Sequence, residues 1–330
     1  MKTRISAHRA LLLVLGLTAL ALSGCGGDGE NEPPPASDSS VAPSAPEATL
    51  PAGLPGGQLM FSRFDESIHT FLSTHLIRPD GTGEVELAMP GPEGGGQWSR
   101  DGTHIAMVAM LDDGRIGTAI IKPDGTVERV LDIPDPMLNL PCTIWSPDDE
   151  RLACSGFDDA HPARNGVYTV RVSDGGDLQR LTNPPEGMEE FPGDYSPDGR
   201  QFIFKRSPGE APGPLLLVDV RGGKPRPLSD GTYEDPGRFS PAGDRVLTSS
   251  GGRLVVLDLD GNEQGSIEEP GAFLFGPVWS PDGEWMTYSR TTPGVFMADI
   301  FISRVDGSDV WQVTDTPANE ITVEWGPGPG

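Results

Sequence analysis

Short apolar runs separated by turn residues fill the chain from residue 58 to its end. Runs such as Ile105–Val108, Phe202–Phe204 and Trp285–Tyr288 have the composition and length of β-strands. Asp-Gly pairs stand between many of these runs, and Asp-Gly between apolar segments is a strong signal for a β-hairpin. The pattern therefore predicts an all-β domain over residues 58–330.

An aromatic residue followed by Ser-Pro-Asp-Gly, or a close variant, recurs at intervals of 40 to 50 residues, a period typical of propeller blades. The proline fixes φ and the glycine accepts a positive φ, so each copy predicts a tight turn after a strand. We expect the aromatic residues to fill the core between neighbouring sheets, and the aspartates to bond their own turns. The aromatic residues are Trp98, Trp145, Tyr195, Phe239, Trp279 and Trp325, and the aspartates are Asp101, Asp148, Asp198 and Asp282.

Each repeat has room for four strands, and five repeats are complete. Residues 59–87 supply three strands without the first, and residues 321–325 supply one strand with its aromatic residue and nothing more. The two fragments complement each other. We therefore predict a six-bladed β-propeller with four antiparallel strands per blade, closed when the C-terminal strand joins the N-terminal blade, which protects the strand edges.

The repeated Trp-Ser-Pro-Asp-Gly resembles the WD-like repeat of TolB-type β-propellers. The resemblance covers residues 58–330 and implies the propeller fold, but propellers carry many unrelated functions. TolB itself has a separate α/β domain ahead of its propeller, whereas this chain has only a proline-rich segment there.

A basic start (Lys2, Arg4, Arg9) and an apolar stretch of about 13 residues, too short to span a bilayer, predict a secretory signal over residues 1–24. The ending Leu22-Ser-Gly-Cys25 resembles a bacterial lipobox, which implies lipidation of Cys25 after cleavage. Residues 26–57 lack basic and aromatic residues and are rich in proline and glycine. We expect residues 25–57 to form a disordered, lipidated tether.

The formal net charge of −25 argues against nucleic acid, because a phosphate-binding face needs clustered Lys and Arg. Cys142 and Cys154 flank a predicted turn on neighbouring antiparallel strands. They face each other in one register and lie on opposite faces after a slip of one residue. We predict a disulfide, with two buried thiols as the alternative.

Length varies most in the loop between the second and third strands of each unit, which shares one face of a propeller with the crossovers between blades. This face is rich in acidic residues and is the candidate partner face. Its alternatives are a weak cation site or merely solvated loops. The candidate residues are Asp158, Asp159, His161, Glu189 and Glu190. The first strand of each blade should line the central channel, with polar side chains at Gln97, Asp194, Arg238 and Glu324 that either bridge the channel or contact a small ligand.

The leading hypothesis is a monomeric, lipid-anchored envelope protein whose propeller binds another envelope protein, without a cofactor. The anchor would place it outside the cytoplasm, on the cell membrane or the outer membrane. An enzyme is less favoured, because the sequence contains no His-Glu-x-x-His, paired-Cys or Gly-x-Ser-x-Gly motif. The alternative is a carbohydrate-active lyase or hydrolase acting at the channel mouth, where His69 and His161 would lie. A third possibility is a stalk or sensor component with no ligand of its own.

Overall fold

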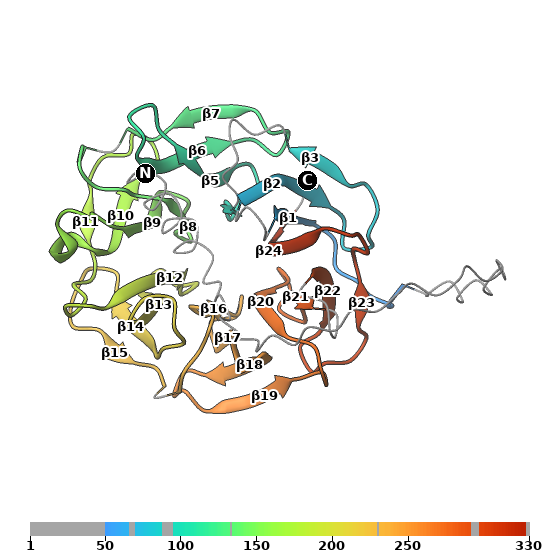
Figure 1. Cartoon of the computed structure of the whole chain (residues 1–330). Coiled ribbons are helices and arrows are strands. Elements are labelled where there is room, and N and C mark those ends of the chain that lie inside the picture. Colours follow the sequence, from blue (N-terminus) through green and yellow to red (C-terminus); the bar gives the residue numbers. More distant parts are fainter. Residues whose placement is uncertain are drawn as a thin grey trace, which may run out of the picture.

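The computed structural model is a ring of six four-stranded antiparallel sheets around a central channel (Figure 1). It describes residues 50–65, 70–87, 95–132, 134–229, 231–291 and 297–327. The sheets are numbered here as blades 1 to 6, and their strands are given from the channel outward. The predicted six-bladed β-propeller with four antiparallel strands per blade is confirmed.

Blade 1 combines the C-terminal strand with the first three strands of the described chain, and blades 2 and 3 follow it in sequence. Blade 1 consists of β24 (Asn319–Gly326), β1 (Gln58–Asp65), β2 (Thr70–Ile77) and β3 (Val85–Leu87). Blade 2 consists of β4 (Gly96–Trp98), β5 (Ile105–Met110), β6 (Ile116–Ile121) and β7 (Val127–Val130). Blade 3 consists of β8 (Cys142–Trp145), β9 (Arg151–Gly156), β10 (Gly166–Arg171) and β11 (Gln179–Arg180).

Blades 4 to 6 complete the ring. Blade 4 consists of β12 (Glu189–Tyr195), β13 (Gln201–Ser207), β14 (Leu215–Asp219) and β15 (Arg226–Pro227). Blade 5 consists of β16 (Arg238–Phe239), β17 (Arg245–Ser250), β18 (Arg253–Asp258) and β19 (Glu263–Ile267). Blade 6 consists of β20 (Leu274–Trp279), β21 (Trp285–Thr291), β22 (Ala298–Arg304) and β23 (Trp311–Gln312).

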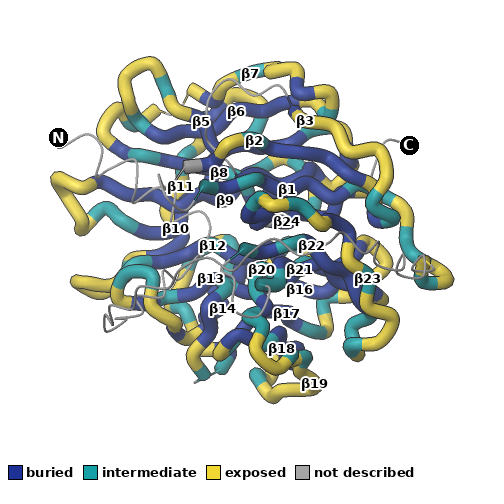
Figure 2. Tube along the Cα trace, turned by 45° about the vertical axis from the view of Figure 1, so that its right-hand side comes forward, coloured by how far each residue is buried: buried dark blue, intermediate teal, exposed yellow. Residues whose placement is uncertain are grey.

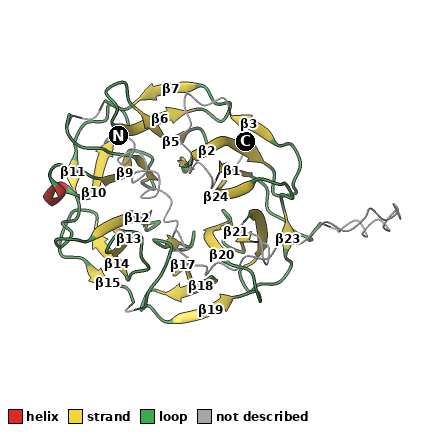
Figure 3. Ribbon diagram, viewed as in Figure 1, coloured by secondary structure: helices red, strands yellow, loops and turns green. Residues whose placement is uncertain are grey.

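The ring closes within blade 1, where β24 pairs antiparallel with β1 and Leu59 lies opposite Trp325. β1 is therefore an inner strand, bonded to β24 on one edge and β2 on the other. Closure by the C-terminal strand is confirmed. Among the described residues the one helical element is the short 3-10 helix η1 (Pro162–Arg164), between β9 and β10 (Figure 3). The described residues contain no helix long and apolar enough to cross a membrane.

The inner strands of the blades are mostly buried (Figure 2), and clusters of core side chains join neighbouring blades. All six repeated aromatic residues are at most 7% exposed, as predicted. Trp145 Nε1 donates to the Gln97 carbonyl oxygen of the preceding blade at 2.9 Å, and Trp279 Nε1 donates to that of Arg238 at 3.0 Å. These indoles thus pack between sheets and also satisfy backbone groups of the neighbouring blade.

The aspartates of the repeat stabilise their own turns, as predicted. Asp198 Oδ1 accepts hydrogen bonds from Ser196 Oγ at 2.7 Å and from the Arg200 backbone N–H at 3.1 Å. Asp101, Asp148 and Asp282 make the equivalent bonds. The turns lie on one face of the ring, here called the turn face. The opposite face carries the loops between second and third strands and the crossovers, and is here called the loop face.

The predicted signal peptide, Cys25 and residues 26–49 of the tether lie outside the described residues, and so does His69.

Candidate functional site

Four polar side chains meet in the central channel, all from innermost strands. Gln97 comes from β4, Asp194 from β12, Arg238 from β16 and Glu324 from β24. Gln97, Asp194 and Glu324 are at most 7% exposed. The structure therefore brings the predicted channel-lining residues together.

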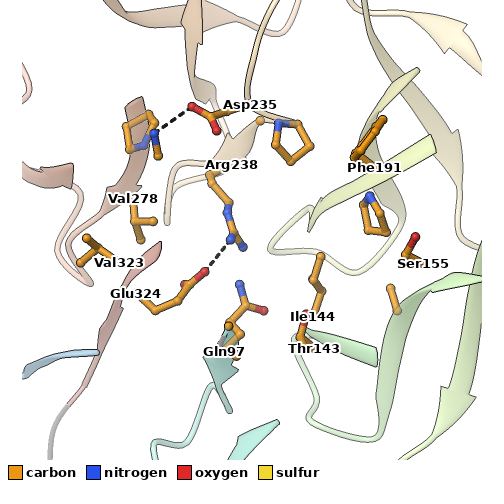
Figure 4. Close-up of a pocket in the computed structure, with 18 of the residues that line it drawn as sticks. Gln97, Thr143, Ile144, Ser155, Phe191, Asp235, Arg238, Val278, Val323 and Glu324 are labelled. Carbon is orange, nitrogen blue, oxygen red and sulfur yellow. Dashed lines mark hydrogen bonds and ion pairs between the residues drawn. The ribbon is translucent and has the colours of Figure 1, made fainter. Parts of the chain in front are cut away.

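Arg238 and Glu324 form an ion pair, with Arg238 Nη2 at 2.5 Å from Glu324 Oε1 (Figure 4). Arg238 belongs to blade 5 and Glu324 to blade 1, so the pair reaches past blade 6. Burial raises the pKa of Glu324, whereas Arg238 and a hydrogen bond with Gln97 act in the opposite direction. Arg238 thus compensates a carboxylate that would otherwise be buried without a charged partner.

A second ion pair crosses the channel from a residue that the sequence did not identify. Arg100, in the turn after β4, donates from Nη2 to Asp194 Oδ1 at 2.7 Å, and Asp194 raises the pKa of Arg100. Arg100 belongs to blade 2 and Asp194 to blade 4, so this pair reaches past blade 3. The available signal was the repeat itself, because Arg100 stands where the later copies have proline. The prediction that polar residues bridge the channel agrees with both pairs.

The Arg238–Glu324 pair lies between two solvent-open cavities of the channel, and the Arg100–Asp194 pair lines only the one on the turn face. Gln97, Arg238, Val278 and Glu324 line both and form a common floor. Counting the space that is open to solvent, the empty volume is about 970 Å³ in the loop-face chamber and about 1080 Å³ in the turn-face chamber.

The loop-face chamber has mostly uncharged walls above its charged floor. Phe275 and Val278 contribute partly exposed apolar surface, Phe191 and Leu247 lie buried behind it, and glycine–proline segments contribute backbone. At the rim, Asp235 Oδ2 accepts from the Gly276 backbone N–H at 2.9 Å, which joins blades 5 and 6 (Figure 4). The chamber therefore offers an apolar wall and a polar floor.

A fully buried lysine supports this wall. Lys205 Nζ donates to the Glu234 carbonyl oxygen at 2.6 Å and lies 4.5 Å from the centre of the Phe191 ring. Burial lowers the pKa of Lys205, because the charged ammonium loses its hydration. Sequence reasoning missed this residue, which directly follows the apolar run Phe202–Phe204.

Two of the acidic residues assigned to the partner face are buried and paired within the propeller. Asp158 is 3% exposed and accepts from Arg164 Nη1 at 2.8 Å, as well as from two backbone N–H groups of its own loop. Glu190 is 4% exposed and pairs with Arg206 and Thr182. A buried carboxylate needs such partners, and these partners occupy the groups that a docking protein would contact.

The remaining assigned residues lie on the loop face but outside the chamber. Asp159 and His161 are exposed, and Glu189 is half-buried. The His161 side chain, 64% exposed, lies 3.3 Å from Asp158 and does not line the chamber. Within the described residues no group of three or more His, Cys, Asp or Glu side chains is placed to hold a metal ion.

Cys142 and Cys154 lie opposite each other on β8 and β9, with their Cα atoms 3.8 Å apart and their sulfur atoms bonded. A register shift between Cys142 and Ile144 accompanies this pairing. Both residues are fully buried in the core between blades 2 and 3, and neither lines a chamber. In this arrangement the disulfide is a structural link and not part of the candidate site.

Comparisons with known proteins agree with this architecture. No family model matches the chain. An uncharacterized protein of Agrobacterium fabrum, Atu1656, is 29% identical over 219 residues, which cover 59% of this chain and 69% of that protein. The crystal structure of TolB from Acinetobacter baumannii matches with a TM-score of 0.63 and 20% identity, covering 83% of this chain and 68% of TolB.

An oligogalacturonate lyase of Vibrio parahaemolyticus also matches, with a TM-score of 0.52, 14% identity and coverage of 77% of this chain and 78% of the lyase. At such identities the likeness concerns the fold alone. Combined with the blade count and strand order, it shows that this chain has the six-bladed β-propeller fold, similar to the propeller of TolB.

Proposed function

We propose that this protein is a lipid-anchored module of the bacterial cell envelope that binds another protein through the loop face of its propeller. Cys25 would carry the lipid, and residues 25–57 would hold the propeller away from the membrane surface. The partner would be an envelope protein that inserts a segment into the loop-face chamber.

The loop-face chamber is the observation that carries this proposal. The partly exposed Phe275 and Val278 can contact an apolar side chain, while Arg238 and Glu324 at the floor can bond the polar end of an inserted segment. Concave sites with apolar walls and a few converging polar groups are typical of ligand binding.

Exposed methionines on the same face support the proposal. Met110 ends β5, and Met137 and Met188 lie in the crossovers that lead into blades 3 and 4. They are 44%, 56% and 37% exposed. Methionine side chains adapt to different partner surfaces, and solvent-exposed ones are common on binding surfaces. The acidic character of the loops adds a preference for a partner with basic residues beside the inserted segment.

Site-specific photocrosslinking in cells tests the docking face. The full chain carries a photoreactive phenylalanine analogue in place of Met137 or Met188, and in matched controls in place of Val310, which is 54% exposed beside the outermost strand of blade 6. We expect the same crosslinked partner from both methionine positions and none from Val310. Equal crosslinking from all three positions, or none from the methionines, would contradict the proposal.

The anchor is tested separately. Metabolic labelling with an alkyne-bearing fatty acid should mark the wild-type chain and not Cys25→Ser, and the variant should leave the membrane fraction. A labelled Cys25→Ser chain would contradict lipidation at this residue without affecting the docking proposal.

A further inference from the structure

The turn face carries proline–glycine contacts between several pairs of successive blades. A Cβ atom added to Gly243 would lie 3.2 Å from Pro197, one on Gly283 would lie 3.2 Å from Pro241, and one on Gly102 would lie 2.4 Å from Pro327. These glycines also have φ between 70° and 73°, so both space and backbone conformation require glycine there. At these three boundaries the glycine of one turn thus lies against the proline of the preceding blade.

The boundary between blades 2 and 3 replaces both partners of this contact. Arg100 stands in the proline position and Asp149 in the glycine position, and Asp149 keeps the positive φ of 56°. Unlike proline, Arg100 has a backbone N–H. It donates to Asp149 Oδ1 at 2.7 Å, and the N–H of Asp101 donates to Asp149 Oδ2 at 3.0 Å. Arg100 and Asp149, the two departures from the proline–glycine contact, therefore bond each other, and this holds the backbone of Arg100 at the channel mouth.

From this position the Arg100 side chain extends into the turn-face chamber. Its guanidinium pairs with Asp194, which is 5% exposed, whereas the Arg100 side chain remains 41% exposed. The acceptor is thus fixed in the wall: Asp194 Oδ2 also accepts from the Phe239 backbone N–H at 3.3 Å. The donor belongs to a side chain that is partly exposed to solvent.

We propose that the turn-face chamber is a binding site for a cationic side chain of a partner, arginine above all, and that Arg100 occupies this site in the free protein. The chamber is lined by two carboxylates, Asp194 and Glu324, and by the guanidinium of Arg238, which Glu324 holds. When Arg100 swings outward, Asp194 is left as a buried carboxylate without its cation, and a second guanidinium restores the pairing. An anionic ligand finds no free cation there. The site lies on the face opposite to the proposed docking face and does not depend on it.

Binding of a short peptide to the full chain tests the proposal. The probe is the capped tripeptide Gly-Arg-Gly, and its control has citrulline, a neutral isostere, in place of arginine. The proteins are wild type, Arg100→Ala, Arg100→Gln, and Arg200→Ala as a matched control, because Arg200 lies in the equivalent turn of blade 4 with an 81% exposed side chain. Affinity is measured by calorimetry, and the fold of each variant by circular dichroism.

We expect the arginine peptide to bind Arg100→Ala and Arg100→Gln about ten-fold or more tightly than wild type or Arg200→Ala, because the internal competitor is gone. Adding Asp194→Asn to Arg100→Gln should abolish that gain, and the citrulline peptide should not bind. Folded Arg100 variants that bind no more tightly than wild type, or equal binding of both peptides, would overturn the proposal.

Discussion

Trp325 packs the closing strand β24 against the core, and Trp325→Ala should weaken the whole propeller. The indole is 7% exposed, packs in one cluster with Leu59 and Trp285, and donates to the Gly56 carbonyl oxygen at 3.2 Å. Removing a buried tryptophan typically costs about 3–5 kcal/mol. A domain is stable by roughly 5–15 kcal/mol, so the variant should still fold but with much of its stability lost.

The assay is urea unfolding of the full chain followed by circular dichroism. With a slope of about 3 kcal/mol per molar urea, the midpoint should fall by about 1–2 M. The control Val310→Ala concerns a side chain that is 54% exposed and should shift the midpoint little. A chain ending at residue 318 also lacks Ile321 and Val323 and leaves an edge of β1 unpaired. It should show no cooperative transition. A midpoint for Trp325→Ala that matches Val310→Ala would refute this account of closure.

Three further outcomes are expected. Without reductant the unfolded chain should show no reactive thiol from Cys142 or Cys154, and with reductant both should react; Cys142→Ser/Cys154→Ser provides the baseline for a thiol-reagent count. Burial raises the pKa of Tyr288 to about 12 and also raises the pKa values of Tyr168 and Tyr195, so in an alkaline titration followed by tyrosinate absorbance these three should ionise only above the pH expected for unfolded chains. Burial lowers the pKa of Lys205 below its value in the unfolded chain, so between these two pKa values the unfolded state binds more protons than the folded state. In that pH range the free energy of unfolding should therefore rise with pH relative to Lys205→Met. Urea midpoints of the two proteins that stay parallel from neutral to alkaline pH would contradict this.

The repeat made the scaffold predictable, because each of its features is local and occurs several times. The turn aspartates bond groups two residues away, and the aromatic residues recur at one position per blade, so blade number and closure followed from spacing. The channel residues were also predictable, since each directly precedes a repeated aromatic residue on an innermost strand.

The chemistry of the site depends on contacts between distant segments, and these were not predictable. Arg100 and Asp194 are 94 residues apart, and only the closed ring brings them together. The same reason explains why burial of an acidic residue was not predicted: Glu190, at the start of β12, pairs with Arg206 from the next strand, and this pairing compensates its burial. An acidic residue in a loop was interpreted as exposed, and the sequence carried no signal of its cationic partner.

The place of β1 inside blade 1 has a mechanical consequence. If the chain is anchored through its N-terminal segment, any pull on the propeller enters at Gln58, the first residue of β1. That strand is hydrogen-bonded along both edges, and its register places Leu59 between Trp325 and Ile77. A load along the tether is therefore shared by two rows of backbone hydrogen bonds under shear. It does not peel away a single edge strand, so the ring can resist tension at the point where it would be held.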